Sequence, residues 1–247
     1  MLDAVRRGCK KLIVGLGGSC TNDMGVGAAA ACGADFGDVL TGGTLDKMTD
    51  VDLSQLRKQF AGVEIVAMCD IENPLCGERG AAYVFAPQKG ADAEMVRMLD
   101  ANLRHAANVV ERALGREIAD KPGAGAAGGM GAGMDAFFGA RLCSGIDVVL
   151  DTVDFDGKLP GADYVFTGEG RVDAQSLGGK VVVGVGRRAK NKVPVIAFVG
   201  AIEDPIDAIY DEGVNAVFTI LRRTDANFGT ENDLSLTVDN FMRMHVR

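Results

Sequence analysis

Short apolar runs that end in turn residues recur along this chain. They have the length of β-strands and cover Lys11–Leu16, Val63–Cys69, Ala82–Ala86, Asp147–Leu150, Tyr164–Thr167, Val195–Val199 and Ala216–Leu221. We expect the first run to be a buried strand, and Pro87 to stop the third. Continuous apolar runs of this length are typical of a parallel sheet whose two faces are both covered by helices.

Between these runs, apolar residues recur at helical spacing. The predicted helices cover residues 1–10, 24–32, 53–60, 91–114, 179–190, 203–212 and 232–244. Gly8 and Gly33 are expected to end the first two, because glycine readily adopts the left-handed backbone that closes many helices. Short strands that alternate with helices predict an α/β fold.

Glycine is abundant, at 34 of 247 residues, against a typical share of about 7%. The densest stretch is PGAGAAGGMGAG at residues 122–133. A flexible linker would carry more Ser and other polar residues, so we interpret this stretch as a buried turn or helix entry where backbones approach closely. Gly123, Gly125 and Gly128 have the spacing of a dinucleotide-binding loop. They follow Pro122 rather than a strand, so an oxidoreductase domain is a weak alternative.

Charge and cysteine usage narrow the range of functions. The formal net charge of -8 argues against a nucleic-acid partner. No run reaches the roughly 18 apolar residues of a membrane span, and the apolar run near the N-terminus is too short for a signal peptide. The cysteines show no CxxC pairing, as expected for reduced thiols in a cytoplasmic protein; they are Cys9, Cys20, Cys32, Cys69, Cys76 and Cys143. With only His105 and His245, a zinc site is not expected.

Ligands of parallel α/β sheets bind at the carboxyl ends of strands. The first polar segment in such a place comprises Gly17, Gly18, Ser19, Thr21, Asn22 and Asp23. Its glycines would let backbone N–H groups approach an anion, and the helix that follows favours negative charge. Asp23 could hold a metal ion or cap that helix, and an ordinary strand–turn–helix with a polar cap explains the same pattern.

Two further polar segments follow predicted strands. Asp70 and Asn73 could bind Mg²⁺ or a hydroxyl group, or could form a turn. Gln88 and Lys89 follow the run at Ala82–Ala86, where Lys89 could meet a phosphate or simply be an exposed turn lysine.

A fourth segment, TGEGRVD at residues 167–173, gathers glycines, carboxylates and a guanidinium behind the strand at Tyr164–Thr167. Its candidate residues are Gly168, Glu169, Gly170, Arg171 and Asp173, trailed by Gln175 and Lys180. Phosphoryl transfer needs these types: a backbone that cradles anions, a cation for developing charge, and carboxylates for Mg²⁺ or a proton. Two surface salt bridges are the alternative explanation.

Several of these strings together resemble the signature segments of the type-1 glycerate kinase family. They are GLGGSCTND (15–23), CDIENPLCGERGAA (69–82), VFAPQKGA (84–91), PGAGAAGGMGAG (122–133) and VFTGEGRVDAQSLGGKV (165–181). They stand in the family's order and span most of the chain, although the resemblance fades beyond Leu221. Cys20 and Met24 replace the Ala and Gly that the family usually carries.

The resemblance implies an ATP- and Mg²⁺-dependent kinase that acts on D-glycerate and forms 2-phosphoglycerate rather than 3-phosphoglycerate. It implies a mixed α/β domain, expected at residues 1–155, and part of a flavodoxin-like domain at 156–247. Motif by motif, it assigns ligand binding to the residues of the four segments. From their chemistry, we expect Arg171 to stabilise charge and Glu169 or Asp173 to hold the metal or act as the base. A homodimer is a further expectation.

Relative to that pattern, the chain lacks an N-terminal strand with a PDSFK-like segment and a DGGEGT-like segment. Those parts would supply strands to the sheet and some of the site. A truncated, inactive kinase that serves only as an oligomeric or nucleotide-binding module is therefore the alternative function.

Overall fold

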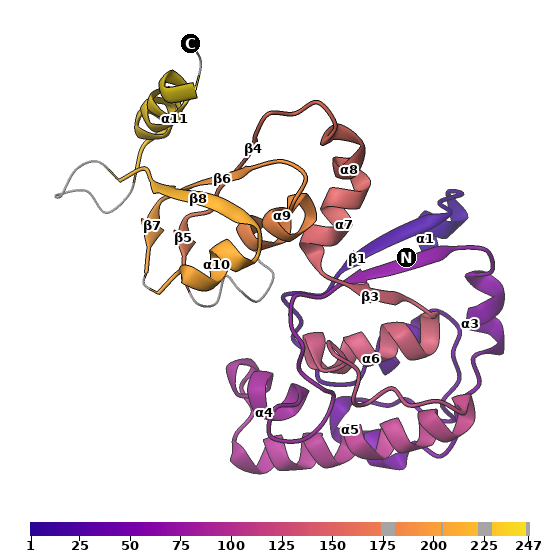
Figure 1. Ribbon diagram of the computed structural model, residues 1–247. Helices are drawn as coiled ribbons and strands as arrows, with labels where there is room; N and C mark the ends of the chain where they lie inside the picture. The colour runs from indigo at the N-terminus through magenta and orange to yellow at the C-terminus, as the bar shows by residue number, and fades with distance from the viewer. Residues whose placement is uncertain (174–180, 204, 222–228, 246–247) are drawn as a thin grey trace. The chain divides into compact units, whose positions relative to one another are not determined.

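The computed structural model describes residues 1–173, 181–203, 205–221 and 229–245 (Figure 1). Two of the predicted site residues, Gln175 and Lys180, lie outside these ranges. The chain forms two compact units, Met1–Gly145 and Ile146–Arg247, hereafter the first and second units. The domain boundary expected at residue 155 stays a prediction.

The first unit is built on a parallel sheet. Its strands are β1 (Lys11–Gly15), β2 (Glu64–Met68) and β3 (Arg141–Cys143), in the order β1-β2-β3. β2 is the central strand, and its Ile65, Val66 and Ala67 are all buried. The sequence did not predict β3, which is only three residues long.

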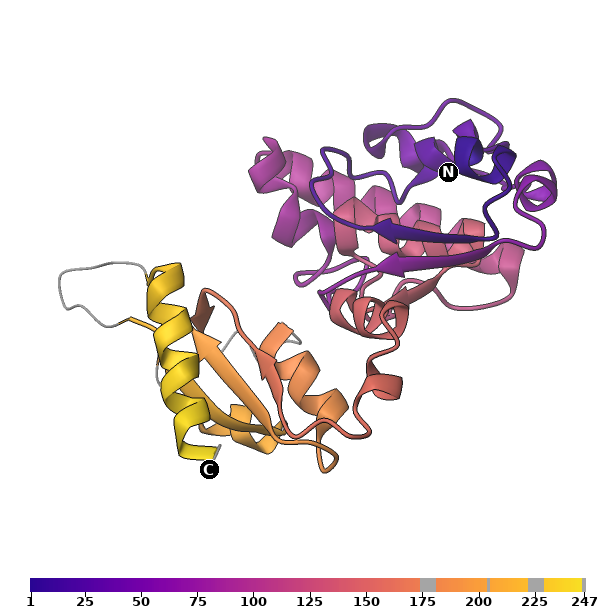
Figure 2. The same ribbon diagram turned by 90° about the horizontal axis from the view of Figure 1, so that it is seen from above.

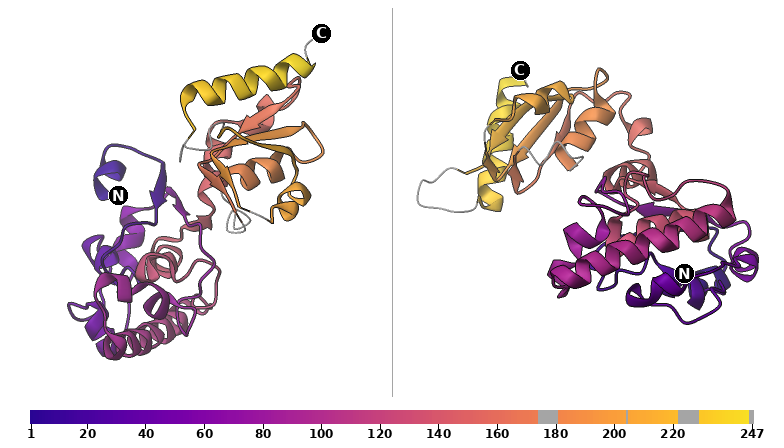
Figure 3. Two further views of the ribbon diagram at one scale, coloured as in Figure 1. Left: turned by 90° about the vertical axis from the view of Figure 1, so that its left-hand side faces the viewer. Right: turned by 90° about the horizontal axis from the view of Figure 1, so that it is seen from below.

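Helices and short 3-10 turns complete the first unit. They are α1 (Leu2–Arg6), α2 (Val26–Ala31), η1 (Gly42–Lys47), α3 (Ser54–Gln59), α4 (Ala81–Phe85), η2 (Pro87–Lys89), α5 (Ala93–Leu114) and α6 (Ala126–Phe138). The glycine-rich helix α6 lies between the sheet and α5, as Figures 1 and 3 show. Its Met134 and Phe137 are nearly inaccessible to solvent, so α6 forms the centre of the core.

The glycines at helix ends act as the sequence predicts. Gly8 has a φ of 91°, and its N–H and that of Cys9 bond back to the carbonyls of Val5 and Ala4. Gly33 has a φ of 95°, and α2 ends in the same way: the N–H groups of Gly33 and Ala34 bond to the carbonyls of Ala30 and Ala29. This left-handed closure satisfies carbonyls that the helix end would otherwise leave without partners.

The second unit contains a parallel sheet of β4 (Val165–Thr167), β6 (Val195–Val199) and β8 (Val214–Thr219), in the order β4-β6-β8. A short parallel pair is formed by β5 (Arg171–Val172) and β7 (Ala201–Ile202), which follow β4 and β6 along the chain. The helices are α7 (Gly145–Thr152), α8 (Phe155–Lys158), α9 (Val181–Ala189), α10 (Asp207–Asp211) and α11 (Glu231–His245).

Both faces of this sheet are covered, which explains the uninterrupted apolar run of β6. Val195, Ala197 and Val199 belong to one buried cluster with α9, whereas Ile196 and Phe198 belong to a second cluster with Phe241 of α11. The Phe241 ring makes edge contacts with the rings of Phe198 and Phe218. Figure 2 shows α11 running along that face.

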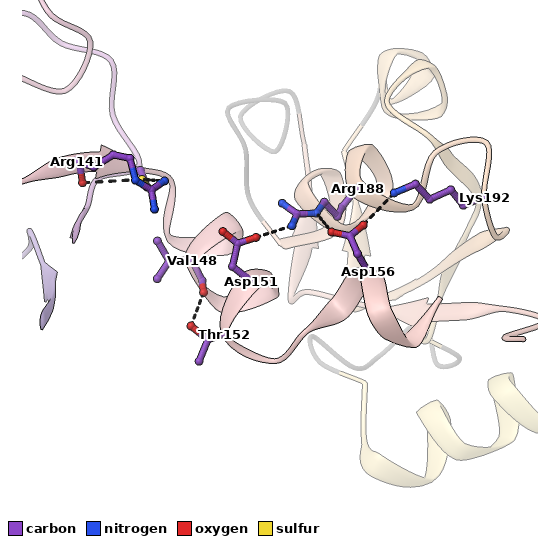
Figure 4. A network of polar contacts seen from close by, with 8 residues as sticks. Arg141, Val148, Asp151, Thr152, Asp156, Arg188 and Lys192 are labelled. Carbon is purple, nitrogen blue, oxygen red and sulfur yellow. Dashed lines mark hydrogen bonds and ion pairs between the residues drawn. The ribbon is translucent and has the colours of Figure 1, made fainter. Parts of the chain in front are cut away.

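An ion-pair network joins α7 and α8 to α9 inside the second unit (Figure 4). Arg188 pairs with Asp151 and with Asp156, and Lys192 pairs with Asp156 at 2.9 Å. The hydrogen bonds from Lys192 and Arg188 lower the pKa of Asp156. Because all these side chains are substantially exposed, the network orients the helices more than it stabilises them.

The α/β prediction is confirmed, but three local predictions are wrong. Residues 82–86 are helical rather than extended, with Ala82 and Ala86 buried and Tyr83 and Val84 exposed, a spacing of four. Residues 147–150 belong to α7, whose first N–H group is bonded to the distant Asp70. β1 is an edge strand in which Ile13 is 43% exposed, so it is not a buried strand. Within the described residues, no helix has both the length and the apolar character that crossing a bilayer requires.

Candidate functional site

A cavity of about 600 Å³ opens in the first unit at the carboxyl ends of β1 and β2. Parallel α/β sheets bind ligands at this edge. Six predicted site residues line the cavity: Gly17, Gly18, Ser19, Asp70, Gln88 and Lys89. Segments from three predicted motifs therefore meet at one place, although Ser19 and Lys89, which are hydrogen-bonded there, are 70 residues apart along the chain.

The loop after β1 leaves space on its cavity side. Gly18 has a φ of 64°, in the left-handed region, which is strained for residues with side chains. A Cβ atom at Gly17 or Gly18 would meet no atom within 4 Å. The two glycines therefore leave their backbone open to a ligand instead of packing against the protein.

Lys89 links this loop to the 3-10 turn η2. Its Nζ donates to Ser19 Oγ at 2.8 Å and to the carbonyl oxygen of Thr21 at 2.6 Å. Lys89 is half-buried, and desolvation lowers the pKa of its ammonium group, opposed by the charges of Cys20 and Asp23. It is therefore not a freely solvated turn lysine.

Asp70 and Asn73 follow β2 but do different things. Asp70 lines the cavity, and its Oδ1 accepts the backbone N–H of Gly145 at 2.7 Å. Asn73 does not line the cavity; its Nδ2 donates to the carbonyl of Arg79, and its own carbonyl accepts from Gly125. Asn73 thus shapes the loop at residues 69–80.

The other polar residues of the first loop, Thr21, Asn22 and Asp23, do not line the cavity. Asp23 accepts the N–H groups of Gly25 and Gly27 at the beginning of α2, which is the capping role that the sequence left open. Asn22 is 8% exposed, and neither atom of its amide has a hydrogen-bond partner among the described residues. A buried amide without partners is costly, so Asn22 needs an explanation beyond packing.

The glycine-rich segment at 122–133 positions this loop by close backbone packing, as predicted. A Cβ atom at Gly128 would overlap the carbonyl oxygen of Thr21, and one at Gly133 would overlap that of Met24. Ala127, Gly128 and Gly129 all have positive φ values, which produce the kink where α6 begins. Ala126 and Ala127 at this kink line the cavity.

The fourth predicted segment lies in the second unit, after β4. Gly168 packs against the carbonyl oxygen of Phe198, and the carbonyls of Glu169 and Gly170 accept the N–H groups of Gly200 and Ala201. Oε1 of Glu169 is shielded from solvent, and Asp173 is half-buried. Arg171 pairs with Glu203 at 2.7 Å through side chains that are 60% and 56% exposed.

Sequence reasoning missed several residues of the site. Met68, Cys69, Ile71 and Phe85 line the cavity, and burial raises the pKa of the Cys69 thiol. All are apolar or weakly polar residues beside predicted polar ones, so only their position next to a strand end could have indicated them. Glu203 carried no signal, because its partner Arg171 is 32 residues away.

The described residues contain no group of three or more metal-ligating side chains. Mg²⁺ in kinases usually takes one or two carboxylates and completes its coordination with phosphate oxygens and water. Glu169 and Asp173, four positions apart and both partly buried, have the oxygen donors that such a site needs. The donor set therefore fits Mg²⁺.

Comparisons with known proteins agree with one another. The model of the "Glycerate kinase family" matches residues 1–244, and so extends beyond Leu221, where the motifs had faded. A glycerate kinase of Halalkalibacterium halodurans is 42% identical over 90% of this chain and 60% of its own length. A glycerate 2-kinase of Escherichia coli K12 is also 42% identical, with the same coverage.

A solved structure from Salmonella typhimurium LT2, provisionally named glycerate kinase 2, matches with a TM-score of 0.77 and 38% identity. The match covers 96% of this chain and 63% of that one. This chain spans about 60% of the length of the first curated relatives it matches. By its sequence and its fold, the chain belongs to the glycerate kinase family.

Proposed function

We propose that the protein phosphorylates D-glycerate with ATP and forms 2-phosphoglycerate rather than 3-phosphoglycerate. Family membership supports glycerate as the acceptor, and the name of the E. coli relative, glycerate 2-kinase, favours the 2-hydroxyl group. Since the chain spans only part of its relatives, this activity is a proposal for the protein as a whole.

The observation that carries the proposal is the cavity at the carboxyl ends of β1 and β2. It combines an open glycine backbone, a half-buried ammonium group at Lys89 and a fixed carboxylate at Asp70. An anionic, hydroxylated substrate needs these three elements. The amide of Gln88, on the same wall, adds a donor and an acceptor for a hydroxyl group.

The second unit carries groups of the types that phosphoryl transfer needs. Glu169 and Asp173 would hold Mg²⁺, which neutralises charge on the β- and γ-phosphates when bound. The exposed guanidinium of Arg171 would stabilise charge that develops on the transferred group. The tight packing of Gly168 against the strand β6 fixes the start of this segment.

The test is release of ADP from ATP that depends on D-glycerate, with the product identified by ³¹P NMR. With D-glycerate we expect ADP release and 2-phosphoglycerate as the product. When a simple polyol replaces glycerate, we expect no ADP release. The proposal would be contradicted if a protein that combines this chain with the unmatched part of a relative released no ADP with any small hydroxy acid.

The second candidate is an inactive module that binds nucleotide or associates with other subunits. The coverage of about 60% of its relatives favours it. Calorimetry with ATP and an assay of ADP release together distinguish the two. ATP binding with glycerate-dependent ADP release supports the kinase, whereas a folded chain that binds ATP or forms oligomers without turnover supports the module. We further propose a cytoplasmic location and a homodimer. Sedimentation of the purified chain would test the dimer, and fractionation of cells would test the location.

A further inference from the structure

The cavity of the first unit carries opposite charges on its wall. Among the described residues that line it, Lys89 is the only cation and Asp70 the only carboxylate. The two side chains come from different elements, η2 and the end of β2. The rest of the wall is glycine backbone, small polar groups and apolar side chains.

At the Lys89 end, the positive charge is held by neutral oxygens. Its Nζ donates to a hydroxyl and a carbonyl, and no described carboxylate is hydrogen-bonded to it. An ammonium group has three N–H donors, so one remains for a ligand. Since Lys89 is also partly desolvated, an anion placed here gains more than it would at an exposed lysine.

At the Asp70 end, the carboxylate is fixed in place. Its Oδ1 accepts the N–H of Gly145, whereas no described residue donates a hydrogen bond to Oδ2. A carboxylate with one bound and one open oxygen can accept a proton from a positioned hydroxyl group. The cavity therefore offers a cation for an acid group and a base for a hydroxyl group.

We propose that this cavity is the subsite for the hydroxy acid: Lys89 binds its carboxylate, and Asp70 is the general base for the hydroxyl group that is phosphorylated. The inference rests on the proposed function. The hydroxyl oxygen forms a bond to the γ-phosphorus of ATP, its proton passes to Asp70 Oδ2, and the bond between the γ-phosphorus and the β–γ bridging oxygen breaks. ADP leaves with that electron pair.

The same cavity is poorly suited to the polyphosphate of ATP. A triphosphate carries several negative charges, and one ammonium group with one spare donor would leave most of them unmatched. Asp70 would repel it further. These charges favour the acid in the first unit and leave the nucleotide to other residues.

The test compares Lys89→Met and Asp70→Asn with the unmodified protein, using D-glycerate and its methyl ester. Calorimetry gives dissociation constants, and ADP release gives kcat and KM for each substrate. We expect Lys89→Met to weaken glycerate binding by roughly 10- to 150-fold, the loss expected for a charged hydrogen bond. The variant should bind acid and ester alike, with nucleotide binding unchanged.

For Asp70→Asn we expect glycerate binding within about threefold and kcat lower by about 10²–10⁴-fold. Lys58→Met removes an exposed lysine outside the cavity, and Asp38→Asn alters an exposed carboxylate that also accepts a backbone N–H; both should behave as the unmodified protein. Circular dichroism establishes that each variant is folded.

Failure of this inference is distinct from failure of the proposed function. If ADP release depends on glycerate but Lys89→Met changes the KM of ATP instead, the assignment of Lys89 is wrong. If Asp70→Asn keeps its kcat or loses Mg²⁺-dependent nucleotide binding, Asp70 is not the base. If the chain turns over nothing, its binding of glycerate and the loss of that binding in Lys89→Met still decide the subsite.

Discussion

Gly128 lies so close to Thr21 that a Cβ atom on the glycine would overlap the threonine carbonyl oxygen. That carbonyl also accepts the hydrogen bond from Lys89 at 2.6 Å. The glycine-rich segment and the cavity are therefore joined through one peptide group. A larger side chain at Gly128 of α6 would displace the carbonyl oxygen of Thr21, which accepts the hydrogen bond from Lys89.

Gly128→Ala should therefore destabilise the protein. A left-handed alanine costs roughly 1–2 kcal/mol, and overpacking adds about 1–3 kcal/mol. Denaturation in urea would measure the change in the free energy of unfolding. The control is Gly115→Ala, since Gly115 has a similar φ of 66° but no atom near its Cβ position; an equal loss in both variants would show that the contact with Thr21 is unimportant.

Replacing Asn22 should stabilise the protein. Its amide is buried without partners among the described residues, and each such group costs about 1–3 kcal/mol. Asn22→Leu has nearly the same shape and removes that cost, so the free energy of unfolding should rise by about 1–3 kcal/mol, measured by denaturation in urea. A variant that is less stable than the unmodified protein would mean that the amide is satisfied in solution.

Cys76 predicts a stability change at alkaline pH. Burial, and secondarily the charge of Asp100, raise the pKa of this thiol from 9.0 to about 12. Below pH 9 both states keep the proton; between pH 9 and 12 the unfolded chain releases it and the native protein does not, so stability falls as pH rises. Cys76→Ala should show a shallower decline in urea titrations at pH 8 and 10, whereas Cys9→Ala, which removes an exposed thiol, should not.

The pair between Arg171 and Glu203 should matter little for stability. Both side chains are more than half exposed, and such pairs contribute about 0–1 kcal/mol. Glu203→Gln should therefore change the free energy of unfolding by less than about 1 kcal/mol, as should Asp239→Asn, which breaks the exposed pair with Arg243. Arg171→Ala should instead lower kcat at unchanged stability; a large loss of stability would assign Arg171 to the fold.

Much of the fold follows from the sequence where local signals suffice. Gly8 and Gly33 end helices because glycine adopts at no steric cost the left-handed backbone that their closure needs. The run at Val195–Val199 is buried on both faces, as an uninterrupted apolar strand should be.

Two of the wrong predictions, the strand at 147–150 and the burial of β1, depend on residues far away in the chain. Val148 and Leu150 are buried while Val149 is exposed, an alternation that suits a strand. The N–H group of Gly145 at the start of the helix nevertheless bonds to Asp70, 75 residues earlier, and no local pattern shows this. β1 was expected to be buried, but it has only one partner strand in the described sheet, so half of its backbone groups lack a strand neighbour.

For the site, residue types at strand ends predicted several residues of the cavity wall. They did not predict which polar residues would line the cavity and which would bond to nearby backbone groups. Ser19, Asp70 and Lys89 line it, as their motifs suggested, whereas Asp23 and Asn73 bond to backbone groups of their own surroundings. The difference depends on which way each loop turns. In this chain that is set by glycine contacts far away in sequence.

The packing of the glycine-rich segment also bears on how such sequences are interpreted. Gly123, Gly125 and Gly128 reproduce the spacing of a nucleotide-binding loop, yet a side chain at any of them would strike protein atoms and not a ligand. The glycines at these positions are needed because neighbouring parts of the protein pack too closely for a Cβ atom. A search for cofactor loops by that spacing would select three glycines whose Cβ positions are blocked by protein atoms, and would miss Gly17 and Gly18, where there is room.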